Sequence, residues 1–150
     1  MRIGPKQRFD NEALRRPQHP EPPPVGAKPE QIQRYREVVA EFPVEDLPPL
    51  EIAYWLIKPR TLVRGTWDEP KEAAAWLGER LTEHAFRFAC EAQRDTAHLA
   101  LLVNSSVDKL SWGGDVSLSF YLERPSYLSV ALVTCSPNLA HPELACPVLA

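Results

Sequence analysis

Apolar side chains recur at the spacing of an α-helix in two segments of this chain. The first segment, residues 30–42, is ended by Pro43. The second, residues 69–83, follows Asp68, a suitable N-cap residue, and has Pro70 in its first turn. Steps of three or four residues keep side chains on one helix face, so we predict two amphipathic helices. Their apolar positions are Ile32, Tyr35, Val39 and Phe42 in the first and Ala73, Leu77, Leu81 and Ala85 in the second.

Two segments near the C-terminal end alternate apolar and polar side chains, which is the period of a β-strand. Residues 116–122 carry an apolar side chain at every second position, and residues 127–134 follow after a short turn that contains Pro125. We predict a β-hairpin whose one face is apolar. Its other face is only weakly polar and costly to leave uncovered.

The remaining ordered segments are less regular. Residues 51–58 and 60–66 are rich in β-branched and aromatic side chains, and we predict two strands there. Residues 96–103 are apolar on both faces, which is typical of a central strand. Residues 84–94 alternate as a strand does, and fit a continuation of the preceding helix nearly as well. We favour the strand, leave the helix open, and predict a loop over residues 104–115.

Prolines divide the chain into three regions. The sequence holds 16 prolines, about twice the usual share, and none between residues 71 and 124. Because proline removes a backbone donor, continuous hydrogen-bonded structure belongs in the middle of the chain. We predict a proline-rich extended arm over residues 1–29 and a single α+β domain over residues 30–134. This domain has an antiparallel sheet of four to six strands with the helix of residues 69–83 on one face. An extended tail over residues 135–150 repeats Pro-x-Leu-Ala every five residues.

Charge and composition exclude several classes of protein. Lys and Arg total 17 against 20 Asp and Glu, a net charge of −3, which disfavours direct nucleic-acid binding. The longest apolar run, residues 52–57, is far shorter than the ~20 residues of a membrane-spanning helix.

The cysteines and the N-terminal segment bear on the compartment. Three cysteines, Cys90, Cys135 and Cys146, are an odd number, which disfavours a disulfide-stapled secreted scaffold. The first residues lack the apolar centre of a signal peptide. We predict buried or unreactive thiols in a reducing intracellular compartment. That compartment is the cytoplasm, with the mitochondrial matrix as an alternative because the arm is basic.

Residues that could carry chemistry do not form a recognised pattern. Cys135, His141 and Cys146 are soft zinc ligands that would need a fourth from Glu143 or His98, and no short Cys-x2–4-Cys knuckle accompanies them.

Candidate catalytic groups are equally isolated. Ser105 and Ser106 lack flanking glycines, and Cys90 lies in an apolar alternation. Glu79 and Glu83 share a helix face, where a solvated charged surface is the usual role. We predict no metal, no cofactor and no catalytic residue.

Hydrophobic side chains at both ends of the chain favour a role in a protein assembly. We predict a non-catalytic accessory or structural subunit whose arm and tail bind partner subunits, because stiff proline-rich segments lose little entropy on binding. One alternative is a small enzyme or ligand-binding domain with a cleft near His98, Trp112 and Asp115. Another is a peptide-modification substrate with a reactive C-terminal tail. The predicted partner-binding residues are Phe9, Leu14, Pro22, Pro23, Pro24, Trp67, Trp112, Leu139, Leu144 and Leu149.

Overall fold

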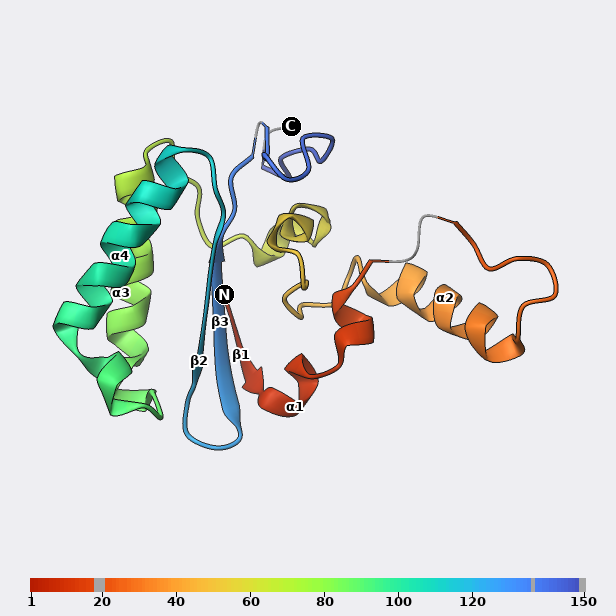
Figure 1. Cartoon of the computed structure of the whole chain (residues 1–150), viewed down its shortest axis with the longest axis horizontal. Helices are drawn as coiled ribbons and strands as arrows, with labels where there is room; N and C mark the ends of the chain where they lie inside the picture. The colour runs from red at the N-terminus through yellow and green to blue at the C-terminus, as the bar shows by residue number, and fades with distance from the viewer. Residues whose placement is uncertain (18–20, 136, 149–150) are drawn as a thin grey trace.

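The computed structural model describes residues 1–17, 21–135 and 137–148. In this part of the chain, three strands form an antiparallel sheet in the order β1-β3-β2, with helices beside it (Figure 1). The strands are β1 (Arg2–Pro5), β2 (Val116–Tyr121) and β3 (Ser126–Leu132). The α+β fold and the hairpin are therefore confirmed, whereas the sheet is smaller than the predicted four to six strands.

The first strand lies in the segment that was predicted to be an extended arm. Ile3 pairs with Leu128, and the short helix α1 (Lys6–Phe9) follows directly. The Phe9 side chain is 2% exposed and meets the Tyr127 ring edge to face at 4.9 Å. A four-residue strand that contains glycine and proline has no alternation long enough to detect, so the boundary predicted at residue 29 is wrong for residues 1–9.

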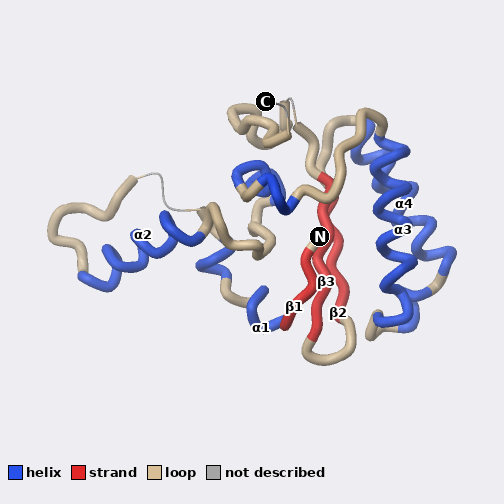
Figure 2. The backbone as a smooth tube through the Cα atoms, turned by 180° about the vertical axis from the view of Figure 1, so that it is seen from behind, coloured by secondary structure: helices blue, strands red, loops and turns tan. Residues whose placement is uncertain are grey.

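The main core lies between the sheet and two helices that pack against each other (Figure 2). These helices are α3 (Pro70–His84) and α4 (Thr96–Ser111). Helix α3 matches the helix predicted over residues 69–83, except that its N-cap is Glu69 and not Asp68. Gly78 of α3 admits the close approach of Val103 of α4. The buried core side chains are Ala73, Leu77, Leu81, Phe88, Leu99, Val116, Phe120, Leu122, Leu128, Val130 and Leu132.

Helix α4 corrects two predictions, the central strand over residues 96–103 and the part of the predicted loop that covers residues 104–111. Its N-cap Asp95 accepts a hydrogen bond from the His98 backbone N–H, which favours a helix start. The side chains that face the core, such as Leu99 and Ser106, recur at helical spacing. Apolar residues on the outer face hid this period, because Leu101 is 66% exposed.

The segments on either side of α3 are single turns and not strands. Residues 84–94 form two 3-10 turns, η4 (Ala85–Arg87) and η5 (Glu91–Arg94), so neither the strand nor the continued helix is correct. Residues 51–66 contain η2 (Ile52–Ile57) and η3 (Arg60–Leu62) in place of two strands. Prolines 48, 49 and 59 flank these turns, which limits the hydrogen bonds that a strand needs.

The remaining helix, α2 (Pro29–Glu41), matches the prediction for residues 30–42. A single turn, η1 (Glu12–Arg15), lies between α1 and the loop that leads into α2. Both views place α2 and its preceding loop away from the sheet, on the side opposite α3 and α4 (Figures 1 and 2).

Candidate functional site

One segment of the described chain that exposes apolar side chains is the projecting arm, which we define as residues 21–44. Its loop carries Val25, whose side chain is fully exposed, and α2 and the residues after it carry Val39 and Val44, which are 43% and 71% exposed. Pro22 and Pro24 are exposed in the same loop, and Pro23 is half-buried. Exposed hydrophobic side chains gathered on one projecting segment are typical of a contact surface.

The base of the arm is fixed to the body by a buried cation. Phe42 is fully buried, and the Lys58 Nζ donates a hydrogen bond to its carbonyl oxygen at 2.6 Å. The same ammonium group lies 3.9 Å from the centre of the Phe42 ring, a cation–π geometry. Burial lowers the pKa of Lys58 to about 8, although Glu45 and Asp46 act in the opposite direction. Lys58 therefore caps the C-terminal end of α2, where a cation is favoured.

Ion pairs join the N-terminal segment to the residues that follow the arm. Arg8 contacts Glu45 at 2.8 Å and Arg2 contacts Asp46 at 3.2 Å. The Arg15 Nε donates to the Pro48 carbonyl oxygen at 2.7 Å. These contacts hold the base of the arm beside β1 and η1.

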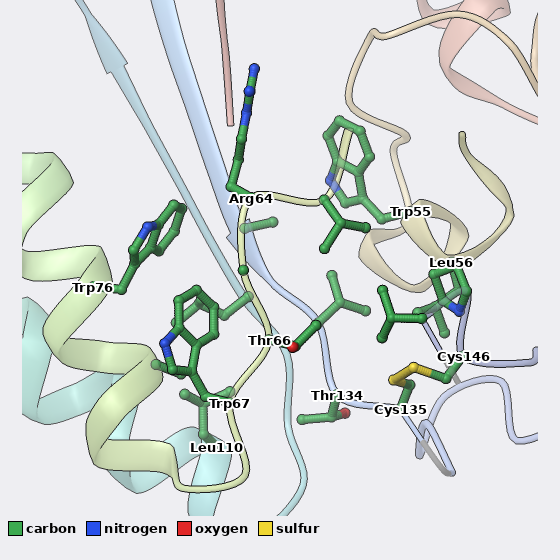
Figure 3. A pocket seen from close by; sticks show the side chains of 18 of the residues that line it. Trp55, Leu56, Arg64, Thr66, Trp67, Trp76, Leu110, Thr134, Cys135 and Cys146 are labelled. Atoms are coloured by element: carbon green, nitrogen blue, oxygen red, sulfur yellow. A yellow bond between two sulfur atoms is a disulfide. The ribbon is translucent and has the colours of Figure 1, made fainter. Parts of the chain in front are cut away.

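A pocket of about 560 Å³ lies between the 55–70 segment, the start of α3 and the end of β3 (Figure 3). Trp67 and Trp76 line one side, with ring centres 5.2 Å apart, and Trp55 lines the other. Its walls are of mixed polarity, and its charged lining residues are Arg64, Asp68 and Glu69. This volume lies in the range of small-ligand sites.

The C-terminal loop is held in place by a disulfide and a buried amide. Cys135 and Cys146 are joined and line the pocket, so the expectation of free thiols is wrong for these two, although Cys146 is buried. Cys90 is a free thiol and is exposed, not buried. The Asn138 side chain is fully buried and donates to both carboxylate oxygens of Asp115 at 3.0 and 3.2 Å. The Asn138 side-chain oxygen accepts the backbone N–H groups of the two residues at 140 and 141.

A histidine links the same loop to η2. The His141 Nδ1 lies 2.8 Å from a Glu143 oxygen, and its Nε2 lies 2.7 Å from a Glu51 oxygen. Both carboxylates raise the pKa of His141, Glu143 most strongly, and the imidazole lowers the pKa of Glu143 in return. The His141 ring also contacts the Tyr54 ring at 4.8 Å.

The predicted partner-binding residues fall in different environments. Phe9 is buried in the chain's own fold, Leu14 and Leu144 are half-buried, and Trp67 lines the pocket. Leu149 lies outside the described residues. The residues that remain available on the surface are Pro22, Pro24, Trp112 at 64% exposure and Leu139 at 59%.

Trp112 and Leu139 are brought to the same turn. The Leu139 side chain packs over Gly113, where φ is +90°, and the Trp112 ring packs over Gly114. The positive φ of Gly113 favours glycine there, whereas a side chain at Gly114 would require the exposed Trp112 ring to move.

The alternative enzyme cleft does not form. His98 is in the first turn of α4 and Trp112 follows its last turn, which separates them by about 20 Å along the helix. The Asp115 carboxylate accepts hydrogen bonds from the backbone N–H and the hydroxyl of Thr134 and from the side-chain amide of Asn138. Among the described residues, no group of His, Cys, Asp and Glu is placed to hold a metal ion. No helix in the described part is long and apolar enough to cross a membrane.

Three positions that shape this site were not indicated by the sequence: Lys58, Asn138 and Glu51. Each works through a partner far away in the chain, such as the contact between Glu51 and His141, 90 residues apart. The isolated lysine next to Pro59 in an apolar run was the one available signal.

Comparison with known proteins gives no relative: no family model, curated protein or solved structure matches this chain.

Proposed function

We propose that this chain is a non-catalytic subunit of a larger protein assembly and that the projecting arm, residues 21–44, binds an apolar groove on a partner subunit. The observation that carries the proposal is the group of exposed side chains Val25, Val39 and Val44 on this segment. We assign partner binding to the projecting arm in place of the two end segments. Residues 2–9 and 137–147 contact other parts of the same chain.

The chemistry of the arm supports an apolar contact with protein. Its acidic residues number four and its basic residues three, so no strong net charge attracts a phosphate or a charged surface. The arm is preorganised for binding: its prolines stiffen the loop, and Lys58 and Phe42 anchor α2 at its C-terminal end. A helix anchored at one end can enter a groove with little loss of entropy.

The test uses the full chain and matched variants. Wild type and the double variant V25E/V39E capture companions from extracts of the producing cells, with F86E as the control. Phe86 is 77% exposed and lies outside the arm, so its variant carries the same change in chemistry elsewhere. A stoichiometric companion is then purified and titrated against each protein by calorimetry.

The proposal expects equal affinity for wild type and F86E and at least a roughly tenfold weaker affinity for V25E/V39E. A purified companion that binds V25E/V39E as tightly as wild type would overturn the role of the arm. Absence of any stoichiometric companion would overturn the assembly role itself.

A second candidate, binding of a small apolar ligand, is supported by the tryptophan-lined pocket. A thermal-shift screen tests it, because a ligand in this pocket raises the melting temperature of wild type and not of T66W, which fills the cavity. If no compound distinguishes the two proteins, the pocket is a packing feature.

An intracellular, reducing compartment and the absence of direct nucleic-acid binding remain proposals. The disulfide between Cys135 and Cys146 makes the first of these testable. Thiol alkylation in intact cells, followed by mass measurement, is expected to label all three cysteines if the compartment is reducing. Labelling confined to Cys90 would contradict it.

A further inference from the structure

The tryptophan-lined pocket contains a cation that no acidic side chain neutralises. Arg64 lines the pocket together with Trp55 and Trp76, and its side chain lies at the end away from the disulfide (Figure 3). In the part of the chain that the structure describes, the Arg64 guanidinium forms no ion pair. A guanidinium binds a carboxylate through paired N–H donors, so Arg64 is suited to hold an anionic group.

The two acidic residues of the pocket have a favourable charge within the chain itself. Glu69 is the N-cap residue of α3, and Asp68 directly precedes it. The N-terminal end of a helix carries a partial positive charge that favours nearby carboxylates. These two carboxylates are therefore accounted for by the start of α3, whereas the charge of Arg64 has no counterpart.

The positive charge of Arg64 acts inside a desolvated part of the pocket. Met1 lines the same pocket, and the pKa of its amino group is lowered, first by burial and then by the charge of Arg64. A neighbouring like charge disfavours the charged form of an amine. The same potential favours an anion at this end of the pocket.

Three tryptophan rings provide a surface for the apolar part of a ligand. Trp67 and Trp76 have ring centres 5.2 Å apart and an interplanar angle of 43°, and Trp55 lies on the other side of the pocket (Figure 3). All three are half-buried, so each ring keeps part of its surface accessible. Aromatic rings contact one another favourably in stacked and tilted arrangements, which favours an aromatic ligand.

We propose that this pocket binds a small aromatic carboxylate. Its carboxylate group pairs with the Arg64 guanidinium, and its ring lies between Trp55 and the Trp67–Trp76 pair. A volume of about 560 Å³ accommodates a ligand of this size. The inference rests on the second candidate function, a small-ligand site in this pocket, and specifies the charge and the aromatic character of the ligand.

Calorimetric titration of the full chain with three probes of one ring system tests the proposal. The probes are naphthoate, the neutral naphthamide and naphthylmethylamine, which is a cation. Wild type is expected to bind naphthoate roughly tenfold more tightly than naphthamide and to bind the amine most weakly. Arg64→Met is expected to weaken naphthoate binding roughly tenfold and to leave naphthamide binding unchanged, while Arg64→Lys retains part of the preference.

Two control variants separate the guanidinium from the rest of the surface. Arg60 is also exposed but lies outside the pocket lining, so Arg60→Met is expected to bind naphthoate as wild type does. T66W fills the cavity and is expected to abolish binding of all three probes. Circular dichroism confirms that each variant is folded.

Equal binding of naphthoate and naphthamide, unchanged by Arg64→Met, would overturn the carboxylate assignment and leave an apolar-ligand site intact. Tighter binding of the amine than of naphthoate would also overturn it. Failure of all three probes to bind wild type would overturn the inference, and the thermal-shift screen with T66W then decides separately whether the pocket takes another ligand. The arm variant V25E/V39E is expected to bind naphthoate as wild type does, so the proposed role of the arm is tested independently.

Discussion

Replacement of Phe9 by alanine tests whether the N-terminal segment belongs to the folded body. The Phe9 side chain is 2% exposed and meets Tyr127 of β3 edge to face. Full burial of a phenylalanine removes at least about 150 Å² of apolar surface from water, which at about 25 cal/mol per Å² contributes close to 4 kcal/mol. The aromatic pair adds about 1 kcal/mol, and relaxation of a short terminal segment recovers part of the loss. We expect Phe9→Ala to lower the free energy of unfolding by about 3 kcal/mol.

Urea unfolding followed by tryptophan fluorescence measures this difference. The matched control is Phe86→Ala, since Phe86 is 77% exposed and its loss is expected to change the free energy of unfolding by less than about 0.5 kcal/mol. If the two variants unfold at the same urea concentration, Phe9 is not buried in solution. The pairing of β1 with β3 would then lose its strongest support.

Three further predictions concern the groups that hold the arm and the C-terminal loop. The double variant C135S/C146S is expected to lose about 2–3 kcal/mol of stability, because the disulfide closes a loop with a sequence separation of 11, while C90S is expected to match wild type in the same urea titration. The pKa of His141 is raised in the folded state, so its stabilising contribution is complete below the unfolded pKa of about 6.5 and is lost as the pH rises through the folded value. Urea midpoints between pH 5.5 and 8.5 are therefore expected to fall more steeply for wild type than for His141→Gln, and parallel curves would contradict the contact. The pKa of Lys58 is lowered to about 8, so the unfolded chain binds the proton more tightly and stability is expected to rise between pH 8 and 10.5. Over that range wild type is expected to gain roughly 1–3 kcal/mol relative to Lys58→Met, and equal pH slopes would show that the ammonium is solvated.

The elements that the sequence predicted are those in which local pattern and tertiary burial agree. Helices α2 and α3 have apolar stripes of regular spacing, and the β2–β3 hairpin alternates over its full length. Helix α4 failed this test because the exposed positions of its first half include Ala97, Ala100 and Leu101, so the period of 3.6 residues was obscured. Strand β1 was not predicted, because four residues are too few to show an alternation. What defines it as a strand is its pairing with β3.

The candidate site was less predictable, because its geometry depends on pairs that are distant in the chain. Exposed tryptophan and leucine at positions 112 and 139 were singled out, but the buried amide of Asn138 that fixes their turn was not. Prolines indicated an extended arm over residues 1–29, and residues 21–28 of it lie in the loop before α2. They gave no sign that Phe9, in the same region of sequence, is buried against the sheet.

The division between a folded body that includes residues 2–9 and 137–147 and a projecting arm is tested most directly by amide hydrogen exchange. The purified protein is measured as a dilute monomer, and protection is compared between peptides that cover residues 2–9, 21–44 and 137–147. The structure predicts slow exchange at the paired amides of β1 and at the amides of residues 140 and 141, and faster exchange in the loop of residues 21–28. Rapid exchange of both ends together with strong protection of the arm would contradict this description of the molecule.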